Sequence, residues 1–198
     1  MKKIKTVPTI PTLPQNLRHR LTALFADGKT VWERFQSEVR RHRFHLFMPA
    51  DYESVLRALL PLRGPRRRFL EWGSATGVIA VMADLLGFEA CGIEIDPDLV
   101  ATARSLAEEH GSGARFAAGS FVPKGYAWKS ETGDTRLGTI EIGEPAYGEL
   151  GRELSDFDLV YAYPWSGEEP ILRDIMRRHG RPGARLLLHG SRSGVEVE

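Results

Sequence analysis

The stretch RFLEWGSATGVIAVMADLLGFEACGIEIDPDLV, residues 68–100, decides the fold of this 198-residue chain. Its first five residues, 68–72, form a short apolar run typical of a strand buried on both faces. Small residues follow at Gly73–Gly77, and the almost wholly apolar segment 78–86 then predicts a buried helix. The pattern therefore indicates a strand, a tight turn and a helix in direct succession.

The same alternation continues along the chain. A second strand is expected over residues 90–95, and Asp96 and Pro97 supply an N-cap and a first helical residue for the next helix. Further strands are expected over 114–118, 158–163 and 184–189, with a helix around 171–176. Strands that alternate with helices of about ten residues imply crossover connections and a parallel sheet covered on both faces. The fold class is α/β, a three-layer sandwich with a mostly parallel sheet.

Composition narrows the class of protein. The chain is 42% hydrophobic and 27% charged, as in ordinary globular domains, and its single cysteine, Cys91, excludes an internal disulfide. The longest apolar stretch, 78–86, is interrupted by Asp84 and is too short to cross a bilayer. Prolines 8, 11 and 14 break the N-terminal segment where a signal peptide needs a continuous apolar core. A cytoplasmic setting without membrane contact is expected.

The N-terminal third is expected to form helices outside the sheet. After an extended arm, helical periodicity begins at Gln15 and runs to about His42, with a break at Asp27-Gly28. Pro49 can open another helix, which Pro61 and Gly64 end. We expect an arm and helical lid over residues 1–62 and the main domain over 63–198.

Charge is distributed unevenly between these parts. Residues 1–69 hold 15 Lys and Arg against 5 Asp and Glu, a net +10, whereas residues 70–198 carry −9. A basic surface beside a site could favour an anionic partner such as RNA. Attraction between two solvated faces of one fold explains the asymmetry equally well, and aromatic residues are not interleaved with the basic runs as strand stacking requires.

The turn at Gly73–Gly77 and the acid Glu94 are the first candidates for chemistry. The dinucleotide pattern needs a small residue where Val78 stands, and a phosphate-binding loop needs a lysine that is absent here. Glu94, at the expected end of the second strand, is placed to accept hydrogen bonds from the two hydroxyls of a ribose. Glu71 could bind a ligand or cap the following helix, and Asp96 fits an N-cap.

Five motifs carry a resemblance to a known family. EWGSATG, GIEIDPDL, FAAGSF, DLVYAYPW and RPGARLLLHG resemble the successive motifs of class I S-adenosylmethionine-dependent methyltransferases, with a Rossmann-like fold, over about residues 45–190. The resemblance implies S-adenosylmethionine (SAM) as the cofactor and methyl transfer as the activity.

The resemblance also implies a role for individual positions. Glu71 and the backbone of the turn would hold the amino and carboxylate ends of the methionine part, and Glu94 would hold the ribose. Ile95 would pack on the adenine, and Gly119-Ser120-Phe121 would face its edge. The family has an acid or amide where Ser120 stands. The implied cofactor-binding positions in the first motif are Glu71, Trp72, Gly73, Ser74, Ala75 and Gly77.

The segment FMPADY resembles the pre-motif of small protein-lysine methyltransferases. By that resemblance Met48, Pro49, Ala50 and Tyr52 would form a lid over the methionine end of the cofactor. A helix entry with packed aromatic residues is the alternative interpretation.

Tyr163, Pro164 and Trp165 are the candidate catalytic residues, because they follow the fourth strand, where the methyl group should emerge. Amine-modifying members carry Asn/Asp-Pro-Pro-Tyr/Phe here, so the absence of Asn argues against adenine or glutamine as the acceptor. Aromatic rings can still favour a cationic amine. Glu168 and Glu169 could accept a proton or form the first turn of the next helix.

The acceptor stays open at this stage. A protein lysine amine or a small molecule is expected, and the alternatives are a non-catalytic SAM-binding protein or an RNA methyltransferase that uses the basic N-terminal third. Histidines 42, 45, 110, 179 and 189 are scattered without metal-ligand spacing, so no metal is expected.

The family's usual fold continues beyond the fifth strand, whereas this chain ends in SRSGVEVE. A C-terminally shortened sheet of about five strands is expected, or a domain completed by the N-terminal helices and by an insertion at about 122–151. That insertion is expected to contain a hairpin around Thr132-Gly133-Asp134. An uncovered sheet edge could also be covered by a second subunit in a homodimer.

Overall fold

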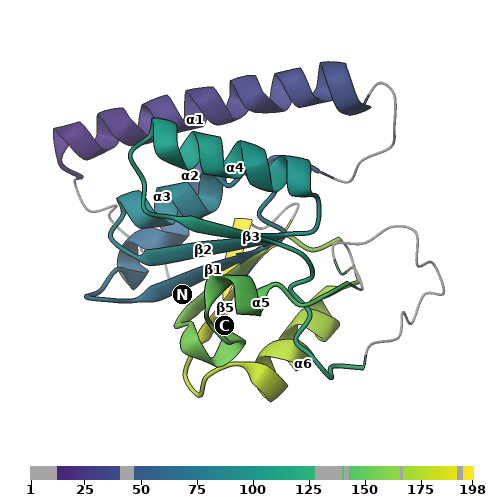
Figure 1. The fold of residues 1–198 in the computed structure, drawn as a ribbon. Coiled ribbons are helices and arrows are strands. Elements are labelled where there is room, and N and C mark those ends of the chain that lie inside the picture. The colour runs from purple at the N-terminus through teal and green to yellow at the C-terminus, as the bar shows by residue number, and fades with distance from the viewer. Residues whose placement is uncertain (1–12, 41–46, 128–139, 141–142, 166, 191–193) are drawn as a thin grey trace, which may run out of the picture.

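Six strands form a single sheet at the centre of the fold (Figure 1). They are β1 (Arg68–Trp72), β2 (Glu89–Glu94), β3 (Arg115–Ala118), β4 (Leu159–Ala162), β5 (Arg185–Gly190) and β6 (Gly194–Val197). Their spatial order is β3-β2-β1-β4-β5-β6, and every pair is parallel except β5 with β6. This computed structural model describes residues 13–40, 47–127, 140, 143–165, 167–190 and 194–198. The predicted α/β class and the first five strands are confirmed.

Helices lie on both faces of the sheet, with one long helix on the outside (Figure 1). They are α1 (Gln15–Phe35), α2 (Tyr52–Leu59), α3 (Val78–Leu85), α4 (Pro97–Glu109), α5 (Tyr147–Leu150) and α6 (Glu169–His179). A π-helical turn at Gln36–Arg40 extends α1, and 3-10 turns occupy Leu60–Leu62 and Leu154–Asp156. Helices α2, α3 and α4 share one face, whereas α5 and α6 lie on the other.

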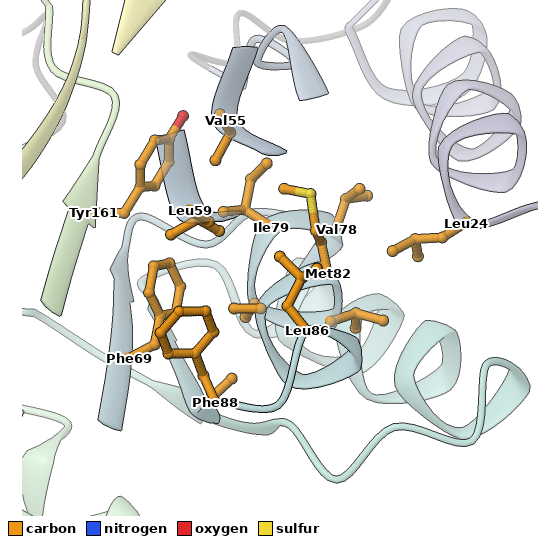
Figure 2. Close-up of a cluster of buried hydrophobic side chains, with 14 of the residues drawn as sticks. Leu24, Val55, Leu59, Phe69, Val78, Ile79, Met82, Leu86, Phe88 and Tyr161 are labelled. Carbon is orange, nitrogen blue, oxygen red and sulfur yellow. The ribbon is translucent and has the colours of Figure 1, made fainter. Parts of the chain in front are cut away.

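Two hydrophobic clusters hold the layers together, one on each face of the sheet. Figure 2 shows the first, in which Leu24 of α1, Leu59 of α2 and Met82 of α3 pack toward Phe69 of β1. Because α1 and α2 contribute fully buried side chains to this cluster, the N-terminal helices share the core of the main domain.

The start of α4 confirms the expected N-cap. Asp96 Oδ1 accepts hydrogen bonds from the backbone nitrogens of Asp98 at 2.8 Å and Leu99 at 3.4 Å. Pro97 occupies the first helical position, where its missing amide hydrogen costs nothing.

The expected break at Asp27-Gly28 is wrong, because α1 runs through both residues. Gly28 is buried at the contact of α1 with α3, and a Cβ there would lie 2.8 Å from Val78 Cγ2 and 3.2 Å from the Tyr52 hydroxyl oxygen. The glycine therefore allows close approach of two helices instead of ending one.

Replacing Gly28 with leucine is expected to destabilise the protein by about 1–3 kcal/mol, because α1 must move away from α3 to admit the side chain. Urea unfolding measures the change. Leucine at Ala26, an exposed position of the same helix, is the matched control and is expected to have little effect. Equal stability of the two variants would contradict the close packing at Gly28.

The helix expected after Pro49 begins later than predicted. Pro49 does not open it. Helix α2 starts at Tyr52, and Asp51 is its N-cap, with Oδ1 accepting from the Ser54 backbone nitrogen at 3.2 Å. Asp51 is the better start because its side chain satisfies a free amide of the first turn.

The expectation of about five strands is also wrong. Residues of the final SGVEVE segment form β6, which pairs antiparallel with β5, for example Val195 with His189. Alternating Val and Glu suit a strand with one face against the protein. The predicted hairpin at 132–134, the arm at 1–12 and basic residues 41–43 lie outside the described residues.

Candidate active site

The turn between β1 and α3 adopts an unusual backbone conformation. Gly73, Ala75 and Gly77 all have positive φ, at 66°, 44° and 77°. The Gly77 nitrogen donates to the Ser74 carbonyl oxygen at 2.7 Å, which closes the turn, and the Ser74 nitrogen donates to the Ile93 carbonyl oxygen at 2.9 Å. The turn is therefore fixed to the end of β2.

Glu94, the last residue of β2, faces this turn. One carboxylate oxygen accepts from the Ala75 nitrogen at 2.8 Å and the other from the Asp96 nitrogen at 3.0 Å. Burial raises the pKa of Glu94, while hydrogen bonds from the backbone of Asp96, Ala75 and Ile95 oppose that rise. A carboxylate has about four acceptor positions, so each oxygen can still accept from a ligand hydroxyl.

Glu71 is buried at the end of β1. Its Oε2 accepts from the Ala80 nitrogen at 2.9 Å, in the first turn of α3, so the carboxylate caps that helix. Burial raises the pKa of Glu71 well above its ordinary value, and the nearby charge of Glu94 adds to the rise. This contact agrees with the helix-capping alternative. Binding of the ammonium group of a methionine part by Glu71 stays a prediction.

Gly119, Ser120 and Phe121 follow β3 directly beside Glu94. The Gly119 nitrogen donates to the Glu94 carbonyl oxygen at 2.9 Å. Ser120 forms a parallel bridge with Pro145, and its Oγ accepts from the Val122 nitrogen at 3.1 Å. Segment 143–146 therefore lies against this edge, where Ile95 is also placed.

Trp72 lies inside the protein and does not line the surface of the turn. Its ring is 1% exposed and stacks on Phe121, with 5.0 Å between centroids. Its Nε1 donates to the Tyr147 hydroxyl at 3.0 Å, which in turn donates to the Phe121 carbonyl oxygen at 2.7 Å. Sequence reasoning missed Tyr147, since nothing in the local pattern connects it to β1.

Tyr163, Pro164 and Trp165 leave the end of β4 in the expected place. Pro164 is buried, Tyr163 is half-buried, and Trp165 is 41% exposed. The Glu168 carboxylate accepts from the Trp165 nitrogen at 2.9 Å and from the Ile140 nitrogen at 3.3 Å. Glu168 is the N-cap position of α6 and Glu169 its first residue, as the helix-turn alternative expected.

Tyr52, the proposed lid residue, lies close to the turn. Its ring centroid is 5.4 Å from that of Phe25, and burial together with the charge of Glu71 raises the pKa of Tyr52 to about 12. Pro49 and Ala50 are half-buried, whereas Met48 is 46% exposed. Segment 48–52 thus extends from the buried neighbourhood of Glu71 to solvent, and its role as a lid stays a prediction.

In the described ranges, no three His, Cys, Asp or Glu side chains come together in a way that could hold a metal ion. Among those same residues, no helix has the length and apolarity to cross a bilayer.

Comparison with a solved structure supports the fold. An RNA methyltransferase from Salinibacter ruber, solved with S-adenosyl-L-homocysteine, matches with a TM-score of 0.51 and 24% identity over 71% of this chain and 76% of that one. The chain shares the Rossmann-like α/β fold of this methyltransferase, which confirms the predicted fold class.

Among curated proteins, the chain is similar in sequence to ribosomal protein L11 methyltransferases. The ribosomal protein L11 methyltransferase of Thermus thermophilus is 37% identical over 136 residues, which cover 69% of this chain and 43% of that protein. The same enzyme of Ralstonia nicotianae is 31% identical over 64% of this chain and 33% of that protein. This chain therefore spans less than half the length of these relatives. No protein-family model matches it.

Proposed function

We propose that this chain binds SAM between the Gly73–Gly77 turn and Glu94 and transfers its methyl group to an acceptor beside Tyr163–Trp165. The contact of Glu94 with the Ala75 nitrogen, 2.8 Å long, carries the proposal, because it places a carboxylate beside the small residues of the turn. The strand order reverses beside β1, and ligands of open α/β sheets bind at the carboxyl ends of strands near such a reversal. The residues present therefore fit an adenosyl ligand.

When bound, SAM supplies a methyl group that is already activated by its sulfonium charge. The chain's own task is to bind, orient and exclude water. Glu94 would hold the ribose hydroxyls, and the small residues of the turn would let the methionine part approach the backbone closely. Tyr163 and Trp165 would align the acceptor, and alignment alone can lower a barrier by several kcal/mol.

A protein amine is the acceptor we favour. The curated relatives are named for methylation of a ribosomal protein, which supports a protein acceptor. The exposed Trp165 ring supports an amine, since an aromatic face attracts a cation. Because these relatives are named for a ribosomal protein, we also propose that this chain acts in the cytoplasm. A non-catalytic SAM-binding role is the alternative that turnover would reject.

Calorimetry with SAM, S-adenosylhomocysteine and NAD tests the cofactor assignment. The first two are expected to bind and NAD is not, because the turn lacks the third glycine of the dinucleotide pattern. Radiolabelled SAM added with the protein and RNA fractions of a bacterial extract then tests the acceptor. Label in protein is expected. Label confined to RNA would overturn the acceptor, and NAD binding without SAM binding would overturn the function.

A further inference from the structure

A row of buried polar side chains crosses the face of the sheet beneath α2. Glu71 on β1 is paired in register with Tyr161 on β4, and Tyr161 is paired with Leu187, two residues before His189 on β5. Side chains two residues apart point to the same face of a sheet. All three polar residues are at most 5% exposed, on a face that is otherwise part of the hydrophobic core.

Tyr161 and His189 form a direct pair. The Tyr161 hydroxyl lies 3.0 Å from His189 Nδ1. Burial raises the pKa of Tyr161 well above its ordinary value and lowers the pKa of His189. The phenol therefore keeps its proton and can donate it to Nδ1 of a neutral imidazole, which leaves the ring hydrogen on Nε2.

The imidazole also contacts the aromatic segment at the end of β4. The Tyr163 ring centroid lies 4.5 Å from that of His189, at an interplanar angle of 36°. Tyr163 is half-buried, so one part of its ring packs on His189 while the rest remains accessible. His189 thus packs against the Tyr163 ring.

Resting on the proposed function, we infer that His189 is a positioning residue for methyl transfer. Tyr161 fixes the imidazole, and the imidazole fixes the Tyr163 ring where the acceptor must bind. Protonation of His189 would place hydrogens on both ring nitrogens and reverse its bond with Tyr161. Only the neutral imidazole leaves the Tyr161 hydroxyl as the donor of this bond.

The titratable groups facing this pair come from three elements. In the described part of the chain they are Asp51 and Tyr52 at the start of α2, Glu71 on β1, and Tyr163 after β4. The charge of Asp51 favours the protonated imidazole, whereas burial, the larger effect, favours the neutral form. The neutral form is thus expected at physiological pH, and it is lost only as pH falls through a pKa that lies below the ordinary value of about 6.5.

Nuclear magnetic resonance tests the pair without an acceptor. In the wild type, the ring signals of His189 and Tyr163 are expected to titrate together, with a pKa below 6.5. Tyr161→Phe removes only the hydroxyl, so the fold is kept and this pKa is expected to rise. Tyr163 signals that ignore the titration of His189, or a pKa unchanged in Tyr161→Phe, would overturn the inference.

Kinetics with radiolabelled SAM and bacterial extract protein give the second readout. His189→Phe is expected to slow transfer about 10- to 100-fold while SAM affinity changes less than twofold, and to remove the part of the pH dependence that follows the titration of His189. A wild-type rate and pH profile in this variant would overturn the inference alone. If the proposed function is wrong, the wild-type protein is expected not to bind SAM. The magnetic resonance experiment would then still test the contacts of His189 with Tyr161 and Tyr163.

Discussion

Replacing Gly77 with alanine is expected to lower the free energy of unfolding by about 3 kcal/mol, a large part of a typical domain's stability. Two effects add. Gly77 has a φ of 77°, a left-handed conformation that costs other residues roughly 1–2 kcal/mol. A Cβ there would also lie 2.6 Å from Phe116 Cζ and 2.7 Å from Ala103 Cβ, so buried groups must move. Chemical denaturation measures the loss.

Gly87→Ala is the matched control for this prediction. Gly87 also has a positive φ, 98°, but a Cβ there would meet no atom within 4 Å. It is expected to lose only the conformational part, about 1–2 kcal/mol. If Gly77→Ala were no more destabilising than Gly87→Ala, the tight packing of the turn against β3 and α4 would be refuted.

Glu94→Ala is expected to weaken SAM binding by about 1.5–3 kcal/mol, as for lost hydrogen bonds to a charged group. This corresponds to a roughly 10- to 150-fold higher Kd by calorimetry. The substitution removes the proposed ribose acceptor and also releases the Ala75 and Asp96 amides that the carboxylate now holds. Both effects are expected to weaken the binding of SAM.

Two variants separate these effects. Glu94→Gln keeps a carbonyl oxygen that can accept from Ala75, so it is expected to bind SAM with intermediate affinity. Asp98→Ala removes an exposed carboxylate of the same region and is expected to change Kd less than twofold. Wild-type affinity in Glu94→Ala would show that the ribose is held elsewhere.

Local patterns were sufficient for most of the fold. Short apolar runs predicted the five parallel strands, and Asp96-Pro97 predicted the start of α4, because each signal arises within a few neighbouring residues. The predicted helix break at Asp27-Gly28 was wrong because its explanation lies outside the local sequence. Gly28 is explained by Val78 and Tyr52, which are distant in sequence, and no helix rule contains them.

The candidate site was predictable only in outline. The spacing of Glu71, the glycine turn and Glu94 predicted which residues meet at the carboxyl edge, since parallel strands bring their ends together. It could not show that Glu71 caps α3 or that Trp72 points into the core. Those outcomes depend on which face each side chain takes. The pairing of Tyr161 with His189 depends on register between β4 and β5, which the sequence does not display.

Strand β6 also has a consequence for behaviour at high concentration. It covers β5 but is itself an outer strand, and its exposed Glu196 carries a negative charge. A second copy adding to this border would bring like charges together, and charged outer strands are a common protection against aggregation. Any homodimer would therefore more readily form through another surface. The charged edge of β6 also disfavours edge-to-edge assembly of molecules into fibrils.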